Sequence, residues 1–170
     1  SYRGVSYAMN ANAFRHFYNY HFAENRTVWS HVTLLTYEQF TQAVDYSRGS
    51  VRDQIVHLID AEDVWFSELR GVEPSEPIPS ADFDDRDAIR AHWDKIEKNS
   101  RAYLAELQDD MLFDKPIKEP EEDQSLIVWQ VLLHVANHAT DHRAQLLRVL
   151  HDLGVETKSQ DYIFYVYENP

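Results

Sequence analysis

The stretch Trp129-Gln-Val-Leu-Leu-His-Val-Ala-Asn-His-Ala-Thr-Asp-His-Arg-Ala-Gln-Leu-Leu147 places three histidines four residues apart in a segment that is otherwise strongly apolar. Residues four apart lie on one face of an α-helix, displaced by about 40° per step. Imidazoles are costly to bury without partners. The stretch therefore predicts a long helix on which at least two rings share one partner, and a divalent metal is a partner of that kind.

A helical projection of this segment separates the three histidines. His142 falls inside the predicted apolar stripe, and His138 lies at the margin of the stripe. His134 lies one step further round, beside Asp141 and Arg148, where it either meets solvent or supports the site from outside. The residues of the stripe are Val128, Val131, Val135, Ala139, Leu146, Val149 and Leu153. The alternative to a metal is a buried hydrogen-bond network, in which each ring donates to a carbonyl or a carboxylate.

Apolar residues at intervals of three and four predict three further long helices. They cover Ala11 to Val32, Ser50 to about Leu69, and Asp84 to Leu107. Ser50 stands three residues before an acid and is the expected N-cap of the second. A short helix is expected after a capping Thr36.

The connections between these segments are marked by proline, glycine and serine. Gly71 to Phe83 contains three prolines and is the expected long connection, and Pro116 to Asp123 is a second, polar one. Ser125 is the expected N-cap of the histidine-bearing helix, and Gly154 is expected to end it. The apolar segment Asp161 to Tyr167 is expected to lie across the bundle, extended or as a short turn of helix.

The chain has 170 residues, enough for one domain with a continuous core. The expected architecture for residues 1–170 is all-α: a single four-helix bundle with a long crossover connection and a C-terminal extended tail. Apolar runs are too short and too often interrupted by charges to cross a membrane, and Ser1 to Asn10 has no signal-peptide pattern. The cytoplasm is the expected location, with no membrane partner.

Composition excludes several kinds of chemistry. The chain has no cysteine, so disulfides, thiolate metal sites and cysteine nucleophiles are excluded, and any metal must be held by histidine and carboxylate. The formal net charge of −13 repels a phosphate backbone. We therefore expect no nucleic-acid partner, and a small molecule as substrate. A metalloprotease of the zincin class is also excluded. That class carries glutamate directly after the first histidine of a pair four residues apart, and Val135 and Ala139 stand in those places.

A third metal ligand must come from another helix, and His57 on the second helix is the leading candidate. Glu62 lies in the apolar stripe of the same helix, where a carboxylate needs a partner. Either it pairs with Arg143 or another base, or it accepts the outer N–H of a ligating histidine. Five histidines show no paired spacing at a core margin and are expected to be ordinary surface or interface residues: His16, His21, His31, His92 and His151.

Two segments resemble signatures of the DinB/YfiT-like family. The segment His134-Val-Ala-Asn-His-Ala-Thr-Asp-His-Arg-Ala-Gln145 resembles the last-helix signature. Gly49-Ser-Val51, followed by His57-Leu-Ile-Asp-Ala-Glu-Asp-Val-Trp65, resembles the second-helix signature. The likeness extends over nearly the whole chain, although Ala144 stands where the family commonly has glycine. It implies a four-helix bundle with a divalent metal held by His57, His138 and His142.

A site of three histidines leaves a coordination position open, as catalytic metal sites do. Such a metal lowers the pKa of a bound water or thiol. Some members of the family use bacillithiol or mycothiol, so the resemblance implies an enzyme that activates a low-molecular-weight thiol for transfer to a small electrophile. Zinc or nickel is the expected metal, and iron is possible. The alternatives are a hydrolase that uses metal-bound hydroxide, with Glu62 or His134 handling the proton, and a non-catalytic metal-binding stress-response module.

Aromatic residues that look exposed gather at both ends of the chain. They are Tyr7, Tyr20, Tyr162, Phe164 and Tyr167. Either the tail packs on its own bundle, or the aromatics form the contact of a symmetric homodimer. Unperturbed histidines further predict that acid releases the metal as the pH falls through about 6.5.

Overall fold

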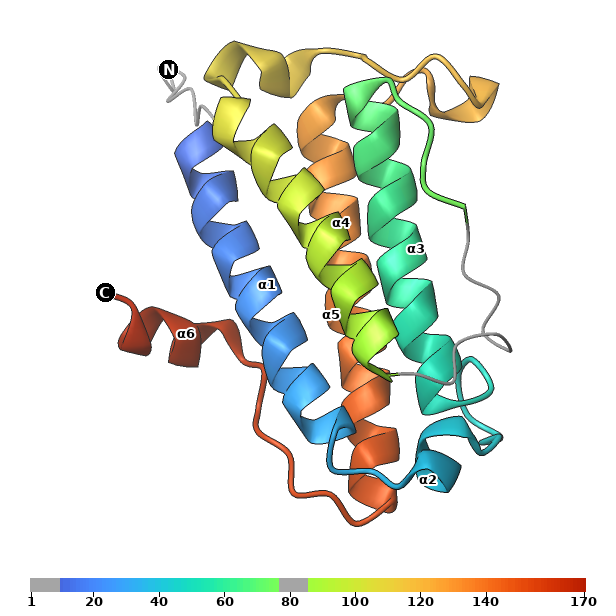
Figure 1. Ribbon diagram of the computed structural model, residues 1–170. Helices are drawn as coiled ribbons and strands as arrows, with labels where there is room; N and C mark the ends of the chain where they lie inside the picture. Colours follow the sequence, from blue (N-terminus) through green and yellow to red (C-terminus); the bar gives the residue numbers. More distant parts are fainter. Residues whose placement is uncertain (1–9, 77–85) are drawn as a thin grey trace, which may run out of the picture.

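The computed structural model describes residues 10–76 and 86–170, which form an all-α bundle with no strand in that part of the chain (Figure 1). The four long helices are α1 (Ala11–Val32), α3 (Val51–Arg70), α4 (Arg86–Glu106) and α5 (Val128–Asp152). The shorter elements are α2 (Tyr37–Thr41), two 3-10 helices η2 (Asp109–Phe113) and η3 (Glu121–Asp123), and α6 (Tyr162–Glu168). The predicted all-α class and the four long segments are confirmed.

The order of the helices around the bundle follows from their contacts. Both α1 and α3 pack against α4 and α5. Figure 1 shows α3 and α4 running in the same direction, with the end of α3 and the start of α4 at opposite ends of the bundle. This parallel arrangement of α3 and α4 fits the predicted long crossover connection. Residues 77–85 of this connection lie outside the described part of the chain.

The predicted helix ends are confirmed at three places and wrong at one. Thr36 and Ser50 cap α2 and α3 with their hydroxyls, and Gly154 ends α5 with a φ of 84°. Ser125 does not cap α5, which begins three residues later, at Val128. There the N–H of residue 127 donates to the side-chain oxygen of Gln130 at 3.1 Å, and the N–H of Val128 donates to a loop carbonyl. These bonds replace the expected serine cap.

The core consists of two apolar clusters, one in each half of the bundle. Phe22, Phe66 and Leu104 belong to one cluster, and Val28 and Ile59 belong to the other. On each of α1, α3 and α4, buried polar residues stand between the segments that supply the two clusters. These residues are His21, Asn25, Glu62 and Ser100. Arg143 of α5 is also buried, and it joins them through a hydrogen bond to Asn25. The bundle therefore has a polar layer between two apolar ones.

Glu62 lies at the centre of this polar layer. Its two carboxylate oxygens accept from His21 Nε2 at 2.5 Å and from Ser100 Oγ at 3.0 Å. Burial lowers the pKa of His21, so the ring is neutral and donates from Nε2. Arg143 approaches the other ring nitrogen at 3.4 Å and donates to Asn25 at 2.7 Å. The assignment of His21 to the surface is wrong, because this ring links the buried carboxylate to the buried guanidinium; His31 is also buried.

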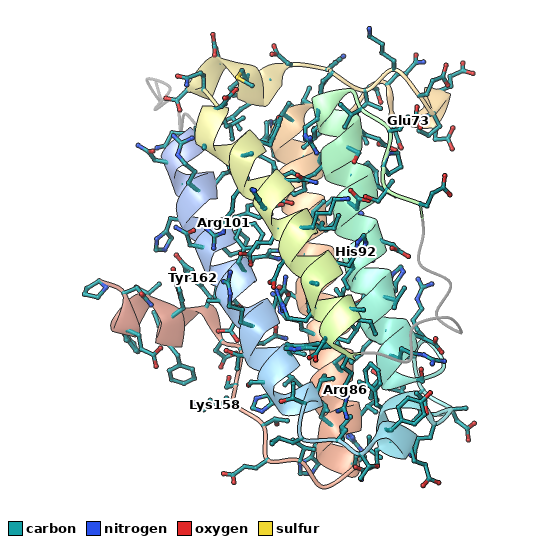
Figure 2. The ribbon with its side chains drawn as sticks, viewed as in Figure 1. Glu73, Arg86, His92, Arg101, Lys158 and Tyr162 are labelled. Carbon is teal, nitrogen blue, oxygen red and sulfur yellow. The ribbon has the colours of Figure 1, made fainter. Side chains whose placement is uncertain are left out.

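The tail after α5 combines the two expected forms, because it has no regular structure from Val155 to Asp161 and then forms α6. Gln160 anchors it, because its side chain accepts from Arg143 Nε at 3.0 Å and its carbonyl accepts from the Tyr20 hydroxyl. Figure 2 shows Tyr162 where α6 meets α1, and its ring contacts Tyr20, which is buried rather than exposed. Four large apolar side chains of α6 remain exposed: Tyr162, although its ring packs on Tyr20, and Ile163, Phe164 and Tyr167. Tyr7 lies outside the described residues.

No helix in the described ranges has both the length and the apolarity needed to cross a membrane.

Candidate metal centre

Three imidazoles from two helices converge at one point between α3 and α5. Each of His57, His138 and His142 offers a ring nitrogen, and the three nitrogens lie within 4.8 Å of one another. The ring centroids are 4.3 to 5.0 Å apart. His142 is buried, whereas the other two rings are half-buried, so the group opens toward solvent on one side.

The donor set fits a divalent metal. The Nε2 atoms of His57 and His138 lie 3.1 Å apart. Two nitrogens bound tetrahedrally to zinc at about 2.0–2.1 Å stand roughly 3.3–3.4 Å apart, so the observed separation needs little adjustment. One N–H···N bond could join these two rings, but it gives no partner to the ring nitrogen that His142 offers at the same point. A single cation can accept lone pairs from all three.

The electrostatics of the centre keep its rings unprotonated. The pKa of His57 is lowered to about 4, first by burial, then by the positive charge of Arg48 and by the other two rings. The pKa of His138 is also lowered to about 4, first by burial and then by its histidine neighbours and Arg48. Burial lowers the pKa of His142, although Asp141 opposes the shift. The lone pairs that a metal requires are therefore available at neutral pH.

The other two candidate residues do not join the triad. His134 is exposed and packs edge-on against Trp65, with ring centroids 5.0 Å apart and 5.8 Å from the ring of His138. Glu62 accepts from His21 and Ser100, so its partner is neither Arg143 nor a ligating histidine. Of the two interpretations of Glu62, the pairing with another base is the one that the contacts support.

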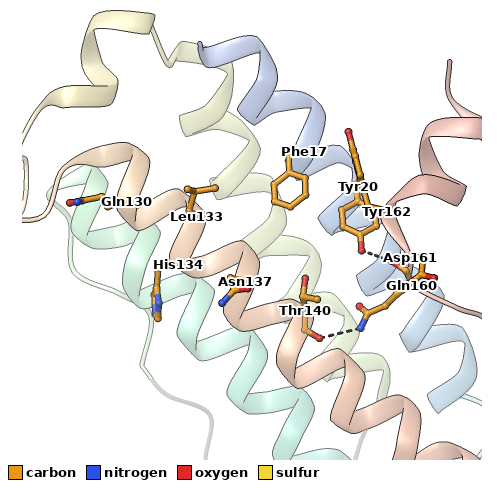
Figure 3. A pocket seen from close by; sticks show the side chains of 10 residues that line it. All are labelled: Phe17, Tyr20, Gln130, Leu133, His134, Asn137, Thr140, Gln160, Asp161 and Tyr162. Atoms are coloured by element: carbon orange, nitrogen blue, oxygen red, sulfur yellow. Dashed lines mark hydrogen bonds between the residues drawn. The ribbon is translucent and has the colours of Figure 1, made fainter. Parts of the chain in front are cut away.

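A groove of about 700 Å³ follows the exposed face of α5 (Figure 3), and none of the three converging histidines lines it. His134 lies at one end, and Tyr162 and Gln160 close the other. The wall between them carries both aromatic and amide side chains, and small-molecule sites typically combine apolar and polar groups in this way. The remaining lining residues are Phe17, Tyr20, Gln130, Leu133, Asn137, Thr140 and Asp161.

Two residues of the centre were missed at the level of sequence. Gln54 lies one turn before His57, and its side-chain amide is 2.8 Å from His142 Nδ1. Its position in a helix pattern is a signal that could have located it, because residues three apart share a face. The positive charge of Arg48, in the loop before α3, lowers the pKa of all three rings. Sequence spacing within a loop does not determine where a side chain lies, so no pattern could have located Arg48.

A four-helix bundle with three histidines converging from its second and last long helices defines a class of protein that builds a metal site from inward-facing side chains. The particular family follows from comparison with known proteins. The model of the DinB family matches residues 9–169, nearly the whole chain, and the protein belongs to the DinB family. No curated protein matches the chain.

Proposed function

We propose that the protein is a metal-dependent enzyme that activates a low-molecular-weight thiol for transfer to a small electrophile. The observation that carries this proposal is the convergence of three neutral imidazoles on one point, with one open side. A divalent metal bound there, zinc or nickel first, supplies an open position and lowers the pKa of a thiol that occupies it.

The charge around the centre favours an anionic ligand. Arg48 is exposed, and its guanidinium lowers the pKa of all three rings, so its positive charge acts at the point where they meet. Among the described residues Arg48 has no ion-pair partner, which leaves the charge available to a thiolate or to a carboxylate on the thiol.

The hydrolase alternative needs a base, and the candidates suit that role poorly. Both oxygens of Glu62 accept hydrogen bonds inside the bundle. His134 lies outside the triad, against Trp65 and at the mouth of the groove. A metal-bound thiol needs no such base, because its proton passes to solvent water once the metal has lowered the pKa of the thiol.

The groove along α5 suits the electrophile or the body of the thiol. Its aromatic end binds apolar groups, and Asn137 offers hydrogen bonds midway along it.

The transfer itself balances without an oxidant. The thiol loses its proton to water, its sulfur forms a bond to an electrophilic carbon, and the displaced group leaves with the bonding electron pair.

Metal analysis of protein purified without an affinity tag tests the first half of the proposal. One equivalent of metal per chain is expected in the wild type, and alanine at any one of His57, His138 and His142 should abolish it. His151→Ala is the control, because His151 is exposed on the same helix as two of the ligands. Full metal content in all three variants contradicts a three-histidine centre.

Cobalt substitution tests the second half. Because the chain contains no cysteine, a sulfur-to-cobalt charge-transfer band can come only from an added thiol. Titration with 2-mercaptoethanol should produce that band, and 3-mercaptopropionate should bind more tightly because its carboxylate meets Arg48. Arg48→Gln should remove the preference while keeping the band. A cobalt spectrum that no thiol changes contradicts thiol activation.

A further inference from the structure

The side-chain amide of Gln54 touches the buried ligand His142 on the nitrogen opposite the metal centre. The amide lies 2.8 Å from Nδ1 of the ring. The nitrogen left to face His57 and His138 is therefore Nε2. A histidine that binds a metal through Nε2 carries its proton on Nδ1, and that N–H needs an acceptor.

We propose that Gln54 is the positioning residue of the metal centre, and that its amide oxygen accepts the Nδ1–H of His142 and so fixes the ring and its tautomer. The proposal rests on the metal centre of the proposed function, and it assigns to Gln54 a role toward that centre.

Hydrogen-bond accounting favours this orientation of the amide. Ser47 Oγ lies 2.9 Å from Gln54 Oε1 and also within hydrogen-bond distance of Gln145 Oε1. A hydroxyl has one proton, so it cannot donate to two carboxamide oxygens. A rotation of either amide by 180° exchanges its oxygen and nitrogen at nearly the same positions.

With both amides rotated, each close contact joins a donor to an acceptor. The two amide nitrogens donate to the two lone pairs of Ser47 Oγ, and Gln145 also donates to Gln54 across 3.2 Å. The oxygen of Gln54 then accepts from His142 Nδ1. The same oxygen meets the His142 carbonyl at 3.4 Å, which is an ordinary van der Waals separation. The metal-binding tautomer and the serine hydroxyl thus require the same amide orientation.

The loop before α3 holds Ser47 where this network needs it. Ser47 has a φ of 72°, in the left-handed region, and Gly49 has a φ of 94°. L side chains rarely adopt the φ of Gly49, so the turn favours glycine there. Gln54 itself is buried, and burial leaves its amide no water to bond with. The loop that carries Arg48 is thereby connected to a ligand of the centre.

Zinc affinity of matched variants tests the role of Gln54. Gln54→Met keeps the length of the side chain but removes the acceptor, and it should raise the zinc Kd by about 10- to 100-fold, as loss of such a partner does elsewhere. Gln54→Glu restores an acceptor and should recover the wild-type Kd. Gln42→Met is the control, because Gln42 is an exposed glutamine outside this network.

The possible outcomes separate the two proposals. A wild type that binds no zinc contradicts the proposed function. A wild type that binds zinc, with Gln54→Met binding equally tightly, overturns only the role of Gln54. Should Gln54→Met fail to fold, ¹⁵N NMR of the zinc-loaded wild type decides. A proton on Nδ1 of His142 with zinc on Nε2 supports the proposal, and the reverse assignment refutes it.

Discussion

At the scale of single residues, the pKa values of the ligands change what acid should do to the metal. Unperturbed histidines predict release as the pH falls through about 6.5. Burial, Arg48 and the neighbouring rings instead lower the pKa of His57 and His138 to about 4. A base with a lowered pKa takes up its proton only at lower pH. Protons therefore compete with the metal for these ring nitrogens only at a lower pH than unperturbed histidines would give.

We therefore predict that zinc affinity is nearly constant from neutral pH down to about 5.5, where a ring of pKa 4 is only about 3 % protonated. It should fall steeply below about pH 4.5. Competition titrations with a chelating dye at each pH measure this directly. A tenfold loss of affinity already between about pH 7 and 6 contradicts the lowered values.

The buried guanidinium of Arg143 gives a second prediction at this scale. Arg143→Met leaves Asn25 and Gln160 without their donor and leaves the charge of Glu62 without a nearby opposite charge. Removing one member of a buried charged network costs about 3–5 kcal/mol of unfolding free energy. Urea denaturation of metal-free protein measures the cost.

Arg148→Met on the same helix is the control for Arg143. Arg148 pairs with Asp152 one turn away, and its side chain is 71 % exposed, so its loss should cost at most about 0.5 kcal/mol. Equal losses in the two variants would show that Arg143 is not a member of a stabilising network.

Helical spacing favoured His138 and His142 as a pair, because one lies at the margin of the apolar stripe and the other inside it, and the family resemblance added His57; the structure brings the three rings together. The partner of Glu62 could not be predicted in the same way. A helical projection places Glu62 in the core but gives no distance to α1, where His21 lies. The role of Gln54 depends similarly on a contact between α3 and α5.

At the scale of helices and turns, the boundaries were predicted best where a side chain determines them. Ser50 accepts from the N–H of Asp53 at 3.0 Å and begins α3. Ser125 fits the same pattern but is exposed and caps nothing, because the N–H of Val128 bonds to the carbonyl of Asp114 in the preceding connection. A tertiary hydrogen bond of this kind is not visible in the local sequence.

This difference predicts the stability of two matched serine variants. Ser50→Ala should lower the free energy of unfolding by about 1 kcal/mol, the usual cost of losing an N-cap. Ser125→Ala should change it by less than about 0.5 kcal/mol, as exposed substitutions usually do. Thermal and urea unfolding measure both, and equal effects would contradict the assignment of the caps.

At the scale of the whole molecule, some apolar residues of the C-terminal tail pack on the bundle and others stay exposed. Tyr162 and Tyr165 pack on α1, which is the self-packing expected from the sequence. Ile163, Phe164 and Tyr167 are 46 %, 49 % and 71 % exposed, although they belong to a helix of seven residues. So short a helix is not stable by itself, and its contacts with α1 and the bonds of Gln160 hold it in place.

The exposed face of α6 leads to the last prediction, that the protein forms a symmetric homodimer through this face. A second copy brings an identical face, and two such faces cover each other in an isologous contact. The full-length chain should then scatter light as a dimer at tens of micromolar, and the double variant Phe164→Ser, Tyr167→Ser should be monomeric with its helix content kept. Leu34→Ser is the control, because Leu34 is 70 % exposed on a different part of the chain and should leave the dimer intact. If the wild type is already monomeric at that concentration, the exposed apolar residues of α6 serve some other purpose and the dimer is excluded.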